Sequence, residues 1–270
     1  MSIGDKWAVH GMGSMDKESS FELLDTYFDM GGYFFDTANT YQGQSSKEFI
    51  GEWAEKRGIR DQLIITKYST NYQHGNDSIV KKVNYIGDTI KSMHLSVGAS
   101  LKRLQTWYID ILYLRWWDYE TSIPEVMDSL HNLVVAQKVL YLGISDTPAL
   151  VISQANQYAM DHGKMPFIVY QGKWSIQNCS FECDIIPMAR SLGMALALWG
   201  VLRQGKLHMD TEEEHWKETG EKGHLVWGPN WECTEVEAKA PFLAICLKPA
   251  SGNQSGIHPT RIDLQLPCRC

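Results

Sequence analysis

The sequence predicts an α/β protein of the (β/α)8 barrel class, in an incomplete form. Six short apolar segments alternate with amphipathic segments of helical spacing. Each apolar segment is nearly continuous, which is typical of strands buried on both faces of a parallel sheet. Strict alternation fits either a barrel or an open doubly wound sheet. No GxGxxG motif follows the first segment, which disfavours the dinucleotide-binding doubly wound form, so the barrel is favoured.

The alternation begins with a helix expected over about 16–32. Its Phe21, Leu24 and Phe28 recur at helical spacing, and Gly31-Gly32 provides an end signal. A second helix, over 45–58, opens with serines and stops at Gly58. The six strands are expected at 33–38, 63–68, 109–117, 139–146, 167–174 and 194–200. The later helices are expected at about 86–104, 123–138, 149–163 and 181–193.

Both ends of the chain depart from this pattern. Only the MSIG of residues 1–4 stands where a first strand belongs, and the alternation stops after about residue 205. A charged helix over 211–224 and a strand over 240–248 fit the local pattern, but four prolines within 233–270 leave no room for a long helix. We therefore predict a barrel over 1–232 and an atypical tail over 233–270. Its last βα units are missing or replaced, so the sheet has open edges.

Composition excludes several classes of protein. The net charge is −7, and no cluster of lysine and arginine offers a nucleic-acid surface, although an anionic cofactor needs only a few local donors. The six cysteines form no CxxC pair, which predicts reduced thiols and no metal site. No run of 18 apolar residues predicts a membrane span, and the N-terminus lacks the apolar core of a signal peptide. We expect a soluble, cytoplasmic protein.

Polar residues stand at the ends of consecutive strands. Asp36, Tyr41, Lys67 and Arg115 occupy such positions, and the carboxyl ends of barrel strands converge on one face. Singly, each has an ordinary structural explanation, with about one chance in ten of a functional role. Together they make chemical sense, because an ammonium beside a phenol lowers its pKa and a carboxylate holds that ammonium in place. A tyrosine so placed can protonate a carbonyl oxygen.

Longer segments resemble a known family. The segment FFDTANTYQGQSSKEFIGEWAEKRGIRDQLIITKY at 34–68 is similar to the catalytic segment of aldo-keto reductases. The segments at 108–134, 172–176 and 195–207 resemble the fungal branch of aryl-alcohol dehydrogenases and norsolorinic acid reductases. The resemblance covers residues 1 to about 232. It implies a (β/α)8 barrel, NADP(H) as cofactor, and reduction of an aryl or polyketide- or terpenoid-like aldehyde or ketone to an alcohol. Such relatives often act in fungal secondary metabolism.

The resemblance assigns roles to individual positions. Tyr41 would be the general acid, Lys67 would adjust its pKa, and Asp36 would pair with Lys67 and border the cofactor. The positions expected to bind NADP(H) follow the later strands. Ser145, Asp146 and Gln171 would hold the nicotinamide carboxamide, Trp199 would stack on the nicotinamide ring, and Gly200, Leu202 and Lys206 would line the pyrophosphate.

Three departures from the family pattern affect this assignment. Arg115 stands where relatives carry a catalytic histidine; it either polarises the carbonyl and lowers the pKa of Tyr41, or pairs with Asp36 in competition with Lys67. An arginine in a close-packed mouth favours impairment. Residues 203–206 read RQGK in place of a glycine-rich GGGK, and 233–270 lack the basic segment for the 2′-phosphate. Two hypotheses remain. The first is an NADP-dependent oxidoreductase, and the second is an impaired remnant, either a cofactor-binding protein or a truncated gene product that folds poorly.

Overall fold

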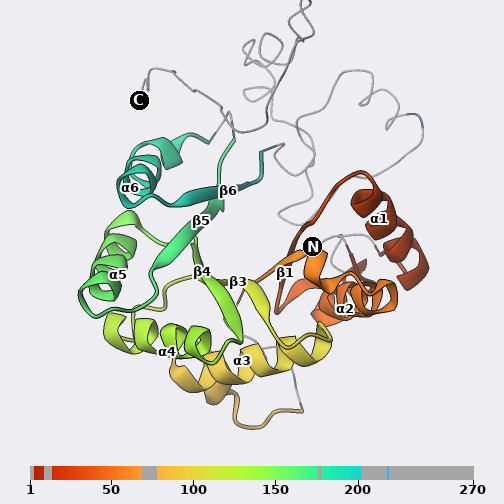
Figure 1. Ribbon diagram of the computed structural model, residues 1–270, viewed down its shortest axis with the longest axis horizontal. Coiled ribbons are helices and arrows are strands. Elements are labelled where there is room, and N and C mark those ends of the chain that lie inside the picture. The colour runs from red at the N-terminus through yellow and green to blue at the C-terminus, as the bar shows by residue number, and fades with distance from the viewer. Residues whose placement is uncertain (1–2, 9–13, 69–77, 176–177, 202–217, 219–270) are drawn as a thin grey trace, which may run out of the picture.

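A computed structural model describes residues 3–8, 14–68, 78–175, 178–201 and 218. It contains one sheet of six parallel strands, paired in sequence order from β1 to β6. The strands are β1 Phe34–Ala38, β2 Ile64–Tyr68, β3 Ile109–Arg115, β4 Val139–Ser145, β5 Phe167–Lys173 and β6 Ala195–Trp199. Figure 1 shows the sheet curving into an arc, with the helices on its outer side.

The helices begin and end at residues with clear local reasons. They are α1 Lys17–Asp29, α2 Ser45–Arg57, α3 Ile90–Arg103, α4 Ile123–Val135, α5 Ala149–Asp161 and α6 Ile185–Leu192. The side chains of Asp16, Thr89 and Ser122 cap the first turns of α1, α3 and α4. Gly58 ends α2 in the left-handed conformation, at a φ of 63°. Four short 3-10 helices join these elements: Tyr41–Gln44, Arg60–Gln62, Lys82–Tyr85 and Ser180–Glu182.

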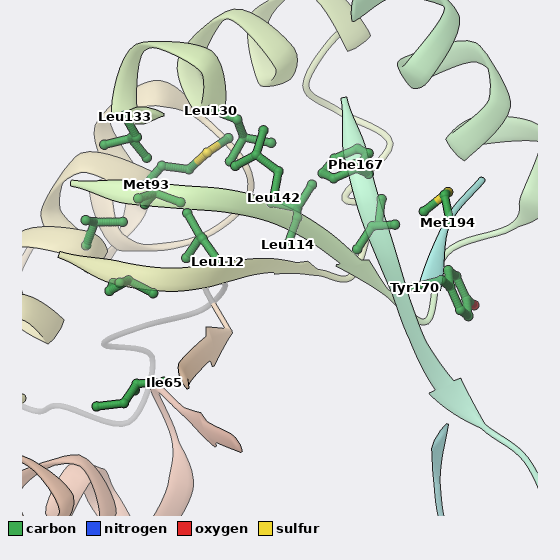
Figure 2. Close-up of a cluster of buried hydrophobic side chains, with 14 of the residues drawn as sticks. Ile65, Met93, Leu112, Leu114, Leu130, Leu133, Leu142, Phe167, Tyr170 and Met194 are labelled. Carbon is green, nitrogen blue, oxygen red and sulfur yellow. The ribbon is translucent and has the colours of Figure 1, made fainter. Parts of the chain in front are cut away.

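The main hydrophobic core lies between the sheet and the helices. Figure 2 shows strand side chains such as Leu112, Leu114 and Leu142 among Met93, Leu130 and other helical side chains. Full burial of such a side chain contributes about 1.5–3 kcal/mol. A second, smaller cluster contains Ala38, Tyr113 and Val169, with Ile111 and Ala197 packed against it. Because strand side chains alternate, this second cluster marks the opposite, inner face of the arc.

The inner face brings together residues that are distant in the chain. Asp36 on β1 accepts a hydrogen bond of 3.3 Å from the Nε2 amide of Gln171 on β5. The arc therefore curls far enough for its first and fifth strands to touch. Gly143 lies beneath the Tyr113 ring, where a Cβ would come within 2.6 Å of the ring. This inner face corresponds to the interior of a barrel.

All six expected strands and the helices between them are confirmed, and the curled parallel sheet is that of an incomplete (β/α)8 barrel. Several boundaries differ by up to four residues. The third strand ends at Arg115, so Trp116 and Trp117 belong to a loop. The third helix starts at Ile90 rather than near 86, because Thr89 caps it. Ile3 and Gly4 form bends rather than a strand. Within the described ranges, β1 and β6 each pair with a single strand.

The expectations for 211–224 fall, except for Glu218, outside the described residues, as does everything predicted for 233–270. None of the helices that the structure describes is long and apolar enough to cross a membrane.

Candidate active site

Asp36 lies on the inner face near the carboxyl end of β1. Its carboxylate accepts hydrogen bonds from Thr66 Oγ1 at 2.6 Å and from Gln171 Nε2 at 3.3 Å. The side chain keeps contact with solvent, yet the protein atoms around it desolvate the carboxyl and raise the pKa of Asp36. The two hydrogen bonds oppose this increase. Asp36 is thus held in a fixed orientation by neutral donors on β2 and β5.

Tyr41 begins the 3-10 helix that follows β1. The left-handed Gln42 and Gly43 turn the chain sharply there, at φ of 51° and 58°. The Tyr41 ring packs edge-on against Trp7, with ring centroids 6.2 Å apart, and it also contacts the inner-face cluster. The backbone N–H of Trp7 donates to the Gln42 side chain at 2.7 Å. These contacts hold the Tyr41 phenol at the edge of the inner face.

A buried polar cluster supports this turn from behind. The ammonium of Lys47, on α2, donates to Asn39 Oδ1 and to Ser100 Oγ, each at 3.1 Å. Asn39 in turn donates to Ser96 Oγ at 2.7 Å. Burial lowers the pKa of Lys47 to about 7. Sequence reasoning missed this cluster, because a lysine in the first turn of a helix is usually solvated.

The described groups around Tyr41 shift its pKa in both directions, and the Lys67 side chain, expected to lower that pKa, lies outside the described part of the chain. Burial raises the pKa of Tyr41 above its usual range, and the carboxylates of Asp36 and Asp146 raise it further. The Arg115 guanidinium lowers this pKa, as one of the two alternatives anticipated, but it does not outweigh burial. Among the groups that the structure describes, the balance therefore keeps Tyr41 protonated and makes it a weak acid.

Arg115 ends β3 and turns toward the next strand. Its Nε donates to Asp146 Oδ2 at 2.8 Å, and its guanidinium lies 5.3 Å from the centroid of the Trp116 ring. Pairing with Asp36 was one of the two alternatives raised from the sequence, and the ion pair that the structure describes is with Asp146 instead. Register explains the correction: Arg115 lies beside Ser145 in the sheet, so the first residue after β4 is within its reach. Arg115 is instead anchored to a residue expected to bind cofactor.

Ser145 and Gln171 lie side by side on β4 and β5, in the same row as Arg115. Ser145 is fully buried, and its hydroxyl finds no hydrogen-bond partner among the described residues. Gln171 is buried and donates to Asp36. A buried hydroxyl without a partner costs about 1–3 kcal/mol. The Ser145 hydroxyl is therefore available to hydrogen-bond a ligand that carries an amide.

Trp199 ends β6, next to Lys173 at the end of β5. The backbone N–H of Trp174 donates to the Trp199 carbonyl at 3.1 Å and ties the two strand ends together. The half-buried Trp199 ring lies 5.9 Å from the Lys173 ammonium. Gly200 follows in the left-handed conformation, at a φ of 76°. Lys173 was not singled out from the sequence, although its position two residues after Gln171 places it on the same face.

Three predicted site residues cannot be placed in this way. The Lys67 backbone lies in β2, opposite Thr37 and Leu112, but its side chain is outside the described part of the chain. Leu202 and Lys206 also lie outside the described residues. Their assigned roles stay predictions.

A cavity of about 540 Å³ opens beside the end of β3. Two loops form it: one precedes α3, and the other joins β3 to α4. Its apolar walls include Trp116 and Trp117, and its polar walls include Asp118 and two glutamates. The backbone N–H of Asp88 donates to Asp118 at 2.7 Å, and that of Asp118 donates back to Asp88 at 3.0 Å. This reciprocal pair fastens the two loops together.

The Asp88 carboxyl is buried, and one of its oxygens lacks a partner. Burial, and then the neighbouring Asp118, raise the pKa of Asp88 to about 8. Among the described residues, this region included, no group of three or more histidine, cysteine or acidic side chains could hold a metal ion.

Comparison with known proteins identifies the family of the chain. The family model for the aldo/keto reductase family matches residues 1–241. The chain is 54% identical over 243 residues to the aryl-alcohol dehydrogenase [NADP(+)] of Phanerodontia chrysosporium, a match that covers 88% of this chain and 63% of that protein.

Two further fungal relatives are similar. Norsolorinic acid reductase B of Dothistroma septosporum is 54% identical over 203 residues, covering 74% of this chain and 51% of the relative. The aldo-keto reductase ausK of Emericella nidulans is 49% identical over 246 residues, covering 91% and 61%. The chain thus spans between half and two thirds of the length of these relatives. It belongs to the aldo/keto reductase family.

Proposed function

We propose that the protein binds NADP(H) on the inner face of its sheet and reduces an aldehyde or ketone to an alcohol, at a rate that Arg115 limits. The observation that carries this proposal is the meeting of Asp36, Tyr41, Arg115 and Gln171 on one face, although they come from elements far apart in the chain. The NADP(+)-dependent relative supports the choice of cofactor.

The residues present fit the nicotinamide end of such a cofactor. The unpartnered Ser145 hydroxyl suits a carboxamide, with Gln171 beside it, and the Trp199 ring offers a flat apolar surface for stacking. When bound, the reduced nicotinamide would supply the hydride. Tyr41 would donate its phenolic proton to the carbonyl oxygen. The Asp36 carboxylate, oriented by Thr66, would raise the pKa of the phenol and so help to keep that proton on Tyr41 until it is transferred.

Arg115 changes this site in two ways. It cannot act as a neutral hydrogen-bond partner of the carbonyl in the way a histidine can, because its guanidinium stays charged. It also holds Asp146, which would otherwise help to bind the carboxamide. Both effects support slow turnover. An impaired protein that binds NADPH but turns over little is the second candidate function, and the Arg115–Asp146 pair is the observation that favours it.

The walls of the cavity support an aromatic substrate. Trp116 and Trp117 line it next to Arg115, and aromatic rings stack favourably on such surfaces. The names of the relatives support aryl alcohols or a polyketide, and we propose a role in fungal secondary metabolism on this basis. We also propose that the protein acts in the cytoplasm.

The decisive experiment compares the natural chain with Arg115→His. We expect NADPH to bind the natural chain and quench its tryptophan fluorescence. We also expect the natural chain to oxidise NADPH only slowly with benzaldehyde. Arg115→His should raise kcat with benzaldehyde by about a hundredfold, the lower end of the contribution of one positioned acid–base group. A circular dichroism melt on each sample controls for folding.

Rapid turnover by the natural chain would show that Arg115 does not impair the reaction. Failure of both proteins to bind NADPH, with cooperative melting intact, would overturn the proposed function itself. As a matched control, Arg103→His changes an arginine on α3 that pairs with Glu48 at the surface. This control should leave turnover unchanged.

A further inference from the structure

Besides Arg115, the described residues of the inner face include a further cation, Lys173, which none of the roles above uses. Lys173 is the last residue of β5, and Gln171, two residues earlier, points inward to Asp36. Alternation along a strand therefore places Lys173 on the same face, above Gln171. The contact of its ammonium with the Trp199 ring, at 5.9 Å, agrees with this direction.

Lys173 differs from Arg115 in its partners. Arg115 is held by the Asp146 carboxylate. Within the described part of the chain, no carboxylate lies within 4 Å of the Lys173 ammonium, and the side chain is exposed. Its charge is therefore not neutralised locally. Cation–π contact with Trp199 holds the charge in place but does not cancel it.

A fixed positive charge at this position distinguishes the two forms of a nicotinamide cofactor. The oxidised nicotinamide ring carries a positive charge, whereas the reduced ring is neutral. Like charges repel, and at separations of several ångströms near a protein surface the repulsion changes affinity by about threefold to tenfold. The phosphates and the adenine end are the same in both forms. A charge next to the ring therefore affects the ratio of the two affinities.

We propose that Lys173 makes the Trp199 subsite select the reduced cofactor over the oxidised one. The protein would then be loaded in the form needed for carbonyl reduction, and the oxidised cofactor would leave more readily after a turnover. This inference rests on the proposed function, because it requires nicotinamide to bind next to Trp199. It adds a residue that determines which form of the cofactor preferentially occupies the site.

Equilibrium binding of the intact chain tests the inference without turnover. The dissociation constants of NADPH and NADP⁺ are measured by fluorescence titration and calorimetry for the natural chain, Lys173→Met and Lys173→Arg. We expect Lys173→Met to lower the ratio of the NADP⁺ constant to the NADPH constant about threefold to tenfold, and Lys173→Arg to preserve it. Raising the salt concentration should shrink the difference between the natural chain and Lys173→Met.

Lys164→Met is the matched control. It removes the same charge just before the amino end of β5, where Lys164 pairs with Asp128 at 3.3 Å, and it should leave the ratio unchanged. Lys173→Gln, with a circular dichroism melt, replaces Lys173→Met if that variant folds poorly. An unchanged ratio in folded Lys173→Met or Lys173→Gln overturns the inference alone. An equal loss of affinity for both cofactor forms in these variants does so too, because it would mean that Lys173 binds a phosphate. Absence of binding in the natural chain overturns the proposed function as well.

Discussion

The two ends of the parallel strands differ in how completely their charged and polar side chains are paired. At the amino end, Arg60 donates to Asp110 at 2.7 Å, to the carbonyls of Leu63 and Tyr108, and to Thr106. Asp110 also accepts the backbone N–H of Ile65 at 2.9 Å. The Arg60 guanidinium stacks 4.0 Å from the centroid of the Tyr108 ring. Each of these donors and acceptors has a partner within the protein.

At the carboxyl end, some buried polar groups have no hydrogen-bond partner among the described residues. The Ser145 hydroxyl and one Asp88 oxygen lack partners among the described residues. The Arg115–Asp146 pair is more open, with side chains 34% and 21% exposed against 14% each for Arg60 and Asp110. The amino end thus gains stability from its charges, whereas the carboxyl end keeps polar groups ready for a ligand. Active sites commonly carry such local costs.

The largest expected effect comes from breaking the amino-end pair. Arg60→Met should lower the free energy of unfolding by about 3 kcal/mol, the lower end for a buried pair, because it leaves Asp110, whose side chain is 14% exposed, without its ionic partner. Urea unfolding followed by circular dichroism measures this loss. Arg103→Met, at the surface pair with Glu48, should cost no more than about 1 kcal/mol. A loss at Arg60 as small as that would contradict the distinction between the two ends.

A smaller, pH-dependent effect is expected at Asp88. Because its folded-state pKa is raised from 3.8 to about 8, its contribution to stability is fully present below about pH 4 and is lost as the pH rises through 8. Asp88→Asn keeps the shape without the charge. The variant should gain about 1–3 kcal/mol over the natural chain between pH 4 and pH 8.

Urea unfolding at several pH values reports this difference. Asp161→Asn, which removes an exposed carboxylate that accepts from Gln157, is the control and should follow the natural chain. Parallel pH curves for Asp88→Asn and the natural chain would show that Asp88 does not hold an unfavourable charge at high pH.

The smallest effect on stability is expected at Arg115. Arg115→Met removes the arginine of the carboxyl-end ion pair, as Arg60→Met does for the amino-end pair. Since this pair is about a third exposed on the arginine side, the free energy of unfolding should fall by less than about 1 kcal/mol. Thermal and urea unfolding of the variant and the natural chain measure this loss. A loss comparable to that of Arg60→Met would mean that both ends depend equally on their ion pairs.

The periodic elements could be predicted from the sequence because their signals are local. Continuous apolar segments located β1 to β6, and helical spacing with caps such as Gly58 located the helices. Asp36, Tyr41 and Gln171 were found through resemblance and strand-end position, and the structure brings them together. What sequence reasoning missed depends on register and burial. The partner of Arg115, the buried Lys47 and the inward Lys173 all follow from which strand or helix lies alongside, which no local pattern encodes.

The hydrogen bond between Asp36 and Gln171 joins residues 135 positions apart. Contacts this distant in the chain form late in folding, because the entropy of closing so large a loop must first be overcome. Helices and neighbouring strand pairs can appear on refolding well before the first and fifth strands meet. Competence to bind a ligand on the inner face should therefore lag behind recovery of secondary structure, and the active site becomes a reporter of the final kinetic phase.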